Sequence, residues 1–317
     1  GIHQGGRFAD DAHEPAPAGT TGDSALLWLR SRNCFAAIWI DSMIARYPVQ
    51  RQMFPEIASR QREPIRMNGV FDAALSHVGA ISLLFTQTVR ETVRKKPEWS
   101  VILDQMHHLG VRSLAIATVT ALFTGMVLAL QTSYSLAAYG AKLFVGDIVS
   151  LSLVRELGPV LTALMVGGRV GAGITAEIGS MKVTEQIDAI RAMAANPVRK
   201  LVVPKVLAIV IMLPILTVFA DFVGIMGGLL MATTTLQQPA AFYMQHVVQA
   251  LSVQDVLSGV GKSLFFALFI SLIACHSGLS AEGGADGVGR ATTQTVVAAS
   301  LSVLVSDFFL TKFFLAF

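Results

Sequence analysis

Charged residues are scarce in this sequence. Only 14% of its 317 residues are Asp, Glu, Lys or Arg, whereas about 25% is usual for a soluble globular domain. Hydrophobic residues make up 53% of the chain, and the mean hydropathy is +0.60. Such a chain is too apolar to be a soluble domain. Its long uncharged stretches match the roughly 20 apolar residues that one transmembrane helix requires.

Cysteines and nucleotide-binding motifs are rare or missing. Cys34 and Cys275 are the only cysteines, which excludes a disulfide framework and a cysteine zinc site. Gly168 and Gly173 have the spacing of a phosphate-binding loop, but Ile174 stands where that loop needs a lysine. The net charge of +3 is not gathered in an aromatic-flanked basic patch. We therefore expect no catalytic residue, metal, cofactor or nucleic acid on this chain.

The sequence divides into three parts. Residues 1–66 are polar or interrupted by charges, and we interpret them as a dispensable, disordered N-terminal extension. Residues 67–109 are expected to form interfacial elbow helices, because apolar side chains recur at helical spacing over 70–93 and basic residues follow. A first transmembrane helix is the alternative interpretation of 70–93. Residues 110–317 are expected to form the membrane domain.

The membrane domain is predicted to be all-α, with five transmembrane helices. Lys and Arg are concentrated before the first span and between the second and third spans. Because these residues prefer the cytoplasmic side, the pattern predicts a cytoplasmic N-terminus and, after five crossings, a C-terminus on the opposite side of the membrane. The approximate spans are 113–141, 148–171, 201–232, 256–280 and 291–316.

The most informative block is 153–208. A charged pair at 155–156 precedes Gly167 and Gly171, which have the small-xxx-small spacing that lets helices approach closely. A polar segment with helical spacing, 177–191, follows on the predicted cytoplasmic side. A short helix there could dock into a soluble ATPase and transmit its movement. An ordinary solvated loop is the alternative.

Ionisable residues within the predicted spans form a second group. A charge at membrane depth costs about 2.5–3.5 kcal/mol on insertion scales, so these side chains are expected to face a protein interior or a wet cavity. A lipid phosphate needs cations and hydrogen-bond donors. Arg155 and Lys262 could supply the cations, and Gln131 and Tyr139 could supply the hydrogen bonds. In the alternative, Arg155 pairs with Glu156, and Lys262 pairs with Asp307, for packing alone.

Two intramembrane carboxyls suggest a different class of function. Asp221 and Asp307 could form the proton-sharing pair of an intramembrane aspartyl protease. Neither lies in the glycine-flanked setting expected for that class, and we interpret Asp221 as structural, near the close-packing Gly224 and Gly228. A stand-alone channel or secondary transporter is a further alternative. Its expected internal repeat is not visible in the sequence.

Several separated motifs resemble the MlaE family, the permeases of ABC transporters that are linked to MCE-domain lipid-binding proteins. The resemblance covers about 67–317. It departs at 194–195, where Ala-Ala stands and the family usually has a glycine after the methionine, which affects local helix geometry. The matching motifs are RELGPVLTAL (155–164), GRVGAGITAEIG (168–179), MKVTEQIDAIRAM (181–193), NPVRKLVVP (196–204), DFVGIMGG (221–228) and GGADGVGRATTQTVV (283–297).

The resemblance implies a non-catalytic permease subunit of an ATP-driven phospholipid transporter. Its implied partners are a second copy of the chain, a cytoplasmic ABC ATPase that holds the ATP, a periplasmic MCE-domain protein and a STAS-domain regulator. Positions matching Gln131, Tyr139, Arg155 and Glu156 would lie near an outward-opening lipid cavity at the dimer interface. The implied ATPase-coupling residues are Glu185, Gln186, Asp188 and Arg191.

Overall fold

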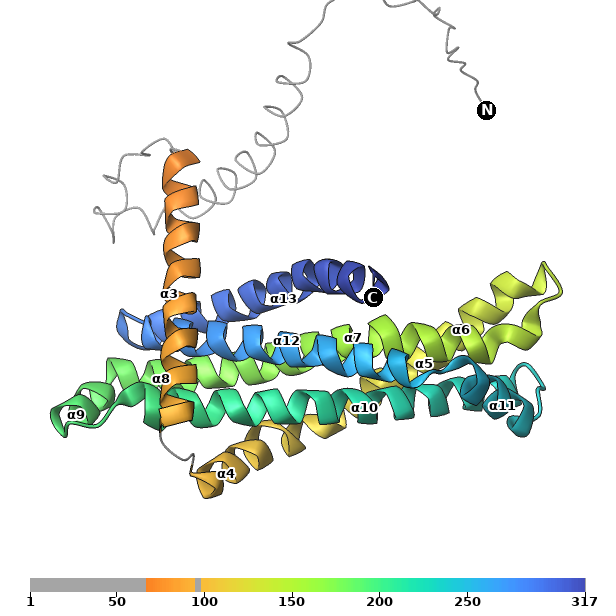
Figure 1. The fold of residues 1–317 in the computed structure, drawn as a ribbon, viewed down its shortest axis with the longest axis horizontal. Coiled ribbons are helices and arrows are strands. Elements are labelled where there is room, and N and C mark those ends of the chain that lie inside the picture. The colour runs from red at the N-terminus through yellow and green to blue at the C-terminus, as the bar shows by residue number, and fades with distance from the viewer. Residues whose placement is uncertain (1–66, 95–97, 317) are drawn as a thin grey trace, which may run out of the picture. The chain divides into compact units, whose positions relative to one another are not determined.

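The computed structural model describes residues 67–94 and 98–316. The described residues from Phe71 onward belong to one compact unit. The predicted extension 1–66 lies outside the described residues. Within the described ranges every regular element is helical (Figure 1), which confirms the all-α prediction.

The membrane domain contains five helical segments that are long and apolar enough to cross a membrane, counted over the described residues. Their number confirms the prediction from hydropathy. The segments are Trp99–Ala137, Val145–Val183, Val198–Thr234, Val253–Leu279 and Gly284–Phe314.

The first, third, fourth and fifth segments are built mainly from one long helix each, whereas the second consists of three shorter helices joined by two π-helical turns. Short helical pieces precede or join the long ones, and a short helix follows the third segment. The α-helices are α3 (Met67–Arg94), α4 (Trp99–Leu109), α5 (Leu114–Ala137), α6 (Val145–Ser152), α7 (Gly158–Val166), α8 (Ala172–Val183), α9 (Gln186–Ala192), α10 (Val203–Thr234), α11 (Ala240–Ala250), α12 (Val253–Leu279) and α13 (Gly284–Ala316). The 3₁₀ turns are Val111–Ser113 and Lys142–Phe144, and the π-helical turns are Leu153–Leu157, Gly167–Gly171 and Val198–Val202.

Helix α3 is the amphipathic helix expected at 70–93. It is not among the segments that could span a membrane, and Figure 1 shows it at a steep angle to α10 and α12. Leu84 on one side of α3 is 7% exposed and joins the core of the bundle, whereas Leu83 beside it is 63% exposed. These observations argue against a first transmembrane helix over 70–93, and the interfacial position of α3 stays a prediction.

The second span is longer than its sequence predicted. The helix does not end near 171, where the span was expected to end, but continues through α8 to Val183. Glu177 on this extension accepts a hydrogen bond from Lys205 Nζ on α10, with 2.6 Å between the atoms. Lys205 itself is 2% exposed. The ion pair allows charged residues to continue a helix where hydropathy alone predicts a loop.

Helices α5 and α10 approach each other through small residues. The buried side of α5 consists of a residue every four positions, all small: Ala117, Ala121, Gly125, Ala129 and Ser133. A Cβ atom on Gly125 would lie 1.9 Å from the carbonyl oxygen of Gly224 on α10. Only glycine therefore fits at Gly125, and the two backbones touch as in other tightly packed membrane helices.

The other glycines named from the sequence also lie at helix contacts. A Cβ on Gly167 would stand 3.0 Å from Ile270 Cδ1 on α12, and one on Gly171 would stand 3.5 Å from Thr295 Cγ2 on α13. A Cβ on Gly228 would stand 2.4 Å from the hydroxyl of Tyr243 on α11. The glycine-rich stretches thus set how closely the second and third spans pack against their neighbours.

Candidate functional site

Arg155 and Glu156 lie on the π-helical turn Leu153–Leu157, in the first third of the segment Val145–Val183. A π-helical turn is wider than an α-helical turn and is frequently found at functional sites. The neighbouring Leu153 and Val154 are buried, whereas Arg155 is exposed and Glu156 half-buried. The turn therefore presents two adjacent charges at the border of the packed bundle.

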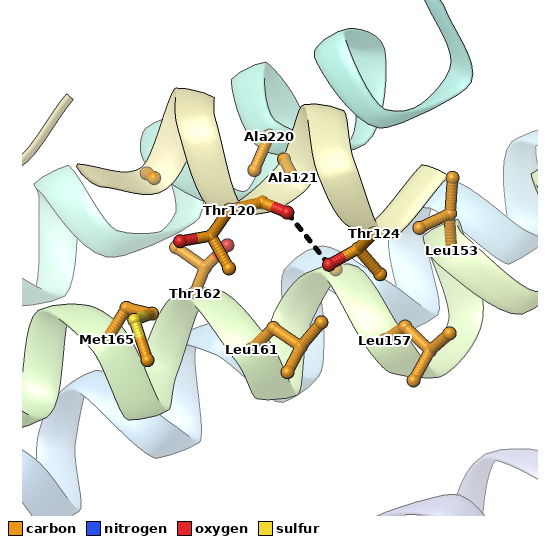
Figure 2. Close-up of a pocket in the computed structure, with 11 residues that line it drawn as sticks. Thr120, Ala121, Thr124, Leu153, Leu157, Leu161, Thr162, Met165 and Ala220 are labelled. Carbon is orange, nitrogen blue, oxygen red and sulfur yellow. Dashed lines mark hydrogen bonds between the residues drawn. The ribbon is translucent and has the colours of Figure 1, made fainter. Parts of the chain in front are cut away.

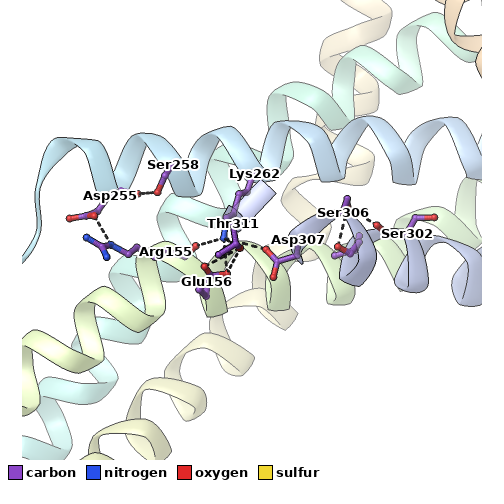
Figure 3. A network of polar contacts seen from close by, with 10 residues as sticks. Arg155, Glu156, Asp255, Ser258, Lys262, Ser302, Ser306, Asp307 and Thr311 are labelled. Atoms are coloured by element: carbon purple, nitrogen blue, oxygen red, sulfur yellow. Dashed lines mark hydrogen bonds and ion pairs between the residues drawn. The ribbon is translucent and has the colours of Figure 1, made fainter. Parts of the chain in front are cut away.

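Lys262 is the centre of a polar network between three spans (Figure 3). Its Nζ donates to Glu156 Oε2 at 2.6 Å, to the Arg155 carbonyl oxygen at 3.0 Å and to Thr311 Oγ1 at 2.7 Å. The Thr311 hydroxyl in turn donates to the Glu156 carboxylate at 3.1 Å. The lysine side chain is 2% exposed, so these partners replace the water that its ammonium group lost.

Asp307 on α13 completes this network. Its Oδ1 atom lies 3.3 Å from Lys262 Nζ, which makes an ion pair without hydrogen-bond geometry. One buried ammonium group thus faces two carboxylates, Glu156 and Asp307. The pairing of Lys262 with Asp307 that the sequence suggested is present, but Glu156 is the closer partner.

Arg155 does not pair with Glu156, as one sequence interpretation held; it pairs with Asp255. Arg155 Nε donates to Asp255 Oδ1 at 2.5 Å. Asp255 is the third residue of α12 and forms a capping box with Ser252, whose backbone N–H and hydroxyl both donate to Asp255 Oδ2. The aspartate side chain is 7% exposed, whereas the arginine side chain is 48% exposed. Asp255 thus holds one edge of a guanidinium group whose other edge is open.

Asp255 was missed by sequence reasoning. A Ser-x-x-Asp pattern before an apolar run signals a helix N-terminus, and Ser252 with Asp255 has that pattern. The pattern predicts the start of α12. It does not predict the contact with Arg155, which lies 100 residues away in the sequence.

Gln131 and Tyr139 lie apart from the Lys262 network. Gln131 is exposed on α5, and Tyr139, in the turn after α5, is 85% exposed. Over the described residues, no hydrogen bond or ion pair joins either side chain to Arg155, Glu156 or Lys262. Three of the five predicted lipid-binding residues are therefore brought together within one chain, and two are not.

An apolar pocket lies on the other side of the same π-helical turn. It opens between α5 and the second span, and Figure 2 shows Thr120 and Thr124 on one wall and Leu157, Leu161 and Met165 on the other. The Thr124 hydroxyl donates to the Thr120 carbonyl oxygen at 2.7 Å, so its polar group is already satisfied within the helix. The pocket wall is consequently apolar, but its volume of about 10 Å³ is that of about one water molecule, so within one chain it is a gap between helices and not a ligand site.

Asp221 is buried beside Gly158, away from the Lys262 network. A Cβ atom on Gly158 would stand 1.6 Å from Asp221 Oδ1, so glycine provides the space that the carboxyl group occupies. That oxygen has no hydrogen-bond partner among the described residues. Asp221 shares no hydrogen bond with Asp307 in the described chain, whereas a proton-sharing protease pair requires close contact. The protease alternative is therefore not supported.

Helix α9 carries the predicted coupling residues on the connection between the second and third spans. Ile187 is fully buried and anchors α9 to the bundle core. Asp188 Oδ2 lies 3.3 Å from Lys182 Nζ, and Asp188 Oδ1 lies 3.0 Å from Arg191 Nη1. The predicted continuous polar helix over 177–191 is interrupted, because Glu185 has a left-handed backbone with φ of 60°.

The exposed part of α9 is available for a partner. Glu185, Gln186, Asp188 and Arg191 are all exposed, in contrast to the buried Ile187. Asp188 is already engaged by two cations within the chain, so it stabilises the position of α9. Over the described residues, no cluster of three or more His, Cys, Asp or Glu side chains could hold a metal ion.

Comparisons with known proteins agree with this architecture. Residues 102–313 match the family model described as Permease MlaE. A probable ABC transporter permease protein of Rickettsia conorii is 42% identical over 237 residues, which cover 75% of this chain and 92% of the relative. A probable ABC transporter permease protein of Synechocystis is 44% identical over 208 residues, or 66% of this chain and 79% of the relative.

One relative has a name that specifies its cargo. It is the intermembrane phospholipid transport system permease protein MlaE of Haemophilus influenzae, 41% identical over 217 residues that cover 68% of this chain and 83% of the relative. The family model spans more than half of the chain and contains all five membrane-spanning segments except their outermost ends. The chain is therefore a multi-pass membrane protein that belongs to the MlaE family of ABC transporter permeases.

Proposed function

We propose that this chain is the membrane-spanning subunit of an ATP-driven phospholipid transporter. The observation that carries the proposal is Arg155: a permanent cation inside the membrane domain, held at Nε by Asp255 while 48% of its side chain stays exposed. Arginine is suited to phosphate because its planar guanidinium group can donate two parallel hydrogen bonds. The phospholipid transport function of the Haemophilus relative supports the same substrate class.

The substrate cavity in this proposal lies between two copies of the chain. Arg155 and Tyr139 are exposed in the single chain, at positions where a second copy could enclose them. The phosphate would contact Arg155, and the acyl chains would lie on exposed apolar helix surfaces such as that of α5, where Phe123 is 58% and Val127 is 55% exposed. Such a site has mostly apolar walls and few polar anchors, as lipid sites require.

The energy in this proposal comes from a separate ABC ATPase in the cytoplasm. Helix α9 would receive its movement, because its exposed residues surround one buried anchor, Ile187. The helix follows the second span directly, so a rigid-body displacement of α9 would move the turn that carries Arg155. The chain itself would hydrolyse nothing and would alternate between two arrangements of the dimer.

The remaining parts of the assembly follow from family membership. We propose a homodimer in the bacterial inner membrane, with the N-terminus in the cytoplasm and the C-terminus in the periplasm. An MCE-domain protein on the periplasmic side would exchange lipid with the cavity, and a STAS-domain protein would regulate the ATPase. The excess of Lys and Arg before the first span and near α9 supports this orientation.

The test is purification of the native complex in mild detergent, with mass spectrometry of its proteins and lipids. We expect an ABC ATPase, an MCE-domain protein and tightly held phospholipid. Reconstitution into liposomes then measures lipid transfer with and without ATP. Recovery of the chain alone, in a form that moves lipid or ions without ATP, would overturn the proposal in favour of a stand-alone channel or secondary transporter.

The role of α9 has its own test. Reversal of charge at Glu185 should weaken copurification of the ATPase, because this side chain is exposed and makes no ion pair within the described residues. Gln254→Lys is the control, since Gln254 is also exposed but lies at the start of α12, which the proposed orientation places on the periplasmic side. Equal ATPase recovery from the two variants would show that α9 is not the coupling helix.

A further inference from the structure

A second cavity lies at the opposite end of the helices from the Lys262 network. It opens between the end of α3, the first turns of α4 and the segment that joins α9 to α10. Its volume is about 670 Å³, which is within the range of small-molecule sites. Arg155 precedes the end of α8 at Val183 by 28 residues of one continuous helical segment, or about 42 Å at 1.5 Å per residue. The two sites are therefore separate.

Basic side chains line this cavity without being neutralised. Arg94, Arg199 and Lys200 contribute to its wall, and two carboxylates, Glu91 and Glu98, also lie on it. None of the three cations makes an ion pair within 4.0 Å with another described residue. The cavity therefore has a net charge of +1 from these five side chains, and its cations are available to an anion.

The deeper wall of the cavity is apolar. Ile102 is 1% exposed and Val203 is 5% exposed, and Pro204 beside them is buried. Val101 continues this surface toward the opening and is 37% exposed. A cavity with cations at its rim and hydrocarbon behind them matches a molecule that has an anionic head and an apolar body.

The cavity lies where the membrane surface should be. It is bounded by the interfacial helix α3 and by the beginnings of two spans, Trp99–Ala137 and Val198–Thr234. Basic pockets between membrane helices on the cytoplasmic side are typical binding sites for anionic lipid headgroups. Charge, shape and depth thus indicate the same ligand.

We propose that this cavity binds an anionic phospholipid of the cytoplasmic leaflet as a resident ligand. The phosphate contacts Arg199 and Lys200 from one side and Arg94 from the other, and the upper acyl chain lies on Ile102 and Val203. Ala194 and Ala195, which directly follow α9, also line the cavity. The bound lipid therefore joins the interfacial helices to the end of α9 and stabilises its position.

The experiment measures lipid binding to the purified full-length chain. Mixed micelles of detergent with fluorescent phosphatidylglycerol give an apparent Kd, and phosphatidylcholine is the zwitterionic competitor. We expect phosphatidylglycerol to bind at least tenfold more tightly than phosphatidylcholine. The double variant Arg199→Gln/Lys200→Gln should lose about 25-fold in affinity, or about fivefold for each basic side chain.

Two further variants make the test specific. Arg90→Gln/Arg290→Gln removes two exposed cations from residues that do not line this cavity, and its affinity should stay within twofold of the parent. Glu91→Gln/Glu98→Gln removes the two carboxylates of the cavity wall and should raise the affinity. A loss of binding that depends only on total charge would appear equally in the control and would refute the site.

Other occupants of the cavity predict other results. Competition by millimolar inorganic phosphate as effective as that by phosphatidylglycerol would identify a site for a soluble anion, and the lipid proposal would be wrong. Unchanged lipid affinity of Arg199→Gln/Lys200→Gln, with loss of the copurifying ATPase, would identify a protein-docking surface and would also refute it.

Discussion

Lys262 donates to Glu156 across 2.6 Å although the two side chains are very differently exposed: 2% for the lysine and 40% for the glutamate. The cation is sealed between α12, α13 and the second span, whereas one carboxylate partner reaches the surface of the bundle. Asp307, 22% exposed, approaches the same ammonium group from α13. The network therefore fixes the positive charge and leaves the negative charge accessible, which makes Lys262 a structural ion and Glu156 the member that can meet a ligand.

Removal of the lysine should destabilise the chain. Lys262→Met leaves Glu156 and Asp307 without a cation, and we expect the free energy of unfolding to fall by about 2–3 kcal/mol. Breaking a buried pair costs about 3–5 kcal/mol, and the exposure of Glu156 lowers this value. Unfolding in detergent by denaturant titration gives the measurement. The control Lys262→Met/Glu156→Gln/Asp307→Asn should regain most of the loss, and failure to regain it would show that Lys262 acts through packing.

Substitution of Arg155 should impair lipid binding more than folding. In Arg155→Gln, Asp255 keeps its hydrogen bonds to Ser252 and continues to cap α12. We expect the Kd for phospholipid in the outer site to rise about tenfold to hundredfold, as for loss of a charged hydrogen bond. Arg155→Lys keeps the charge but lacks the planar guanidinium group, so its Kd should lie between those of the parent and of Arg155→Gln. A melting temperature that falls as much in Arg155→Lys as in Arg155→Gln, with unchanged lipid binding, would assign a purely structural role to Arg155.

The limits of sequence reasoning are visible in the second span. Hydropathy predicted the five spans, because each contains enough apolar residues to cross a bilayer. It ended the second span near 171 and assigned 177–191 to a separate polar segment with helical spacing. The helix continues because Glu177 meets Lys205 from α10. That contact depends on tertiary packing, which no local pattern reveals.

The candidate site was predictable to a similar extent. Arg155, Glu156 and Lys262 could be selected from the sequence alone. A charged side chain in a bilayer is costly and is usually paired or functional. Their partners were not predictable: Asp255 and Thr311 come from residues 100 and 155 positions away in the sequence. The resemblance to a family placed Gln131 and Tyr139 with them, and within one chain they remain apart.

The contact between α5 and α10 predicts opposite effects for two glycine substitutions. Gly125→Ala inserts a Cβ atom 1.9 Å from the Gly224 carbonyl oxygen, so the helices must separate, and we expect a loss of about 2 kcal/mol or more. Gly173→Ala is the control, because no atom lies within 4 Å of its added Cβ. The free energy of unfolding of Gly173→Ala should rise by up to about 1 kcal/mol, because alanine has a higher helix propensity than glycine. Equal effects in a denaturant titration would show that α5 and α10 are not in contact.

Tyr243 carries a buried hydroxyl group with no hydrogen-bond partner among the described residues. Burial raises its pKa to about 12. The pKa of this phenol in the unfolded chain is 10.0. The phenol therefore contributes stability that is present below pH 10 and is lost as the pH rises through about 12. Tyr243→Phe should leave stability at pH 7 unchanged or raise it by up to about 1 kcal/mol, and should reduce its fall above pH 10. Tyr139→Phe, at an 85% exposed position, is the control, and an equal effect there would contradict the assignment.

The Ala-Ala sequence after α9 predicts a stabilising substitution. Ala194 has a φ of 55°, a left-handed conformation that costs an L-residue about 1–2 kcal/mol and that glycine adopts freely. Its N–H donates to the Arg191 carbonyl oxygen at 2.9 Å, and the N–H of Ala195 donates to that of Ile190 at 3.1 Å, the pair of hydrogen bonds of a Schellman motif. We therefore expect Ala194→Gly to stabilise the chain by about 0.5–1 kcal/mol, after the greater backbone entropy of glycine in the unfolded state is deducted.

Ala192→Gly provides the comparison for this prediction. Ala192 is the last residue of α9, one position before the cap, where glycine should destabilise the helix by up to about 1 kcal/mol. Hydrogen exchange of the α9 amides and denaturant titration measure both variants. If Ala194→Gly also destabilised the chain, residue 194 would not adopt the left-handed conformation in the membrane. The end of α9 would then not form the Schellman motif, and that motif could not be what positions α9 beside the proposed anionic-lipid cavity.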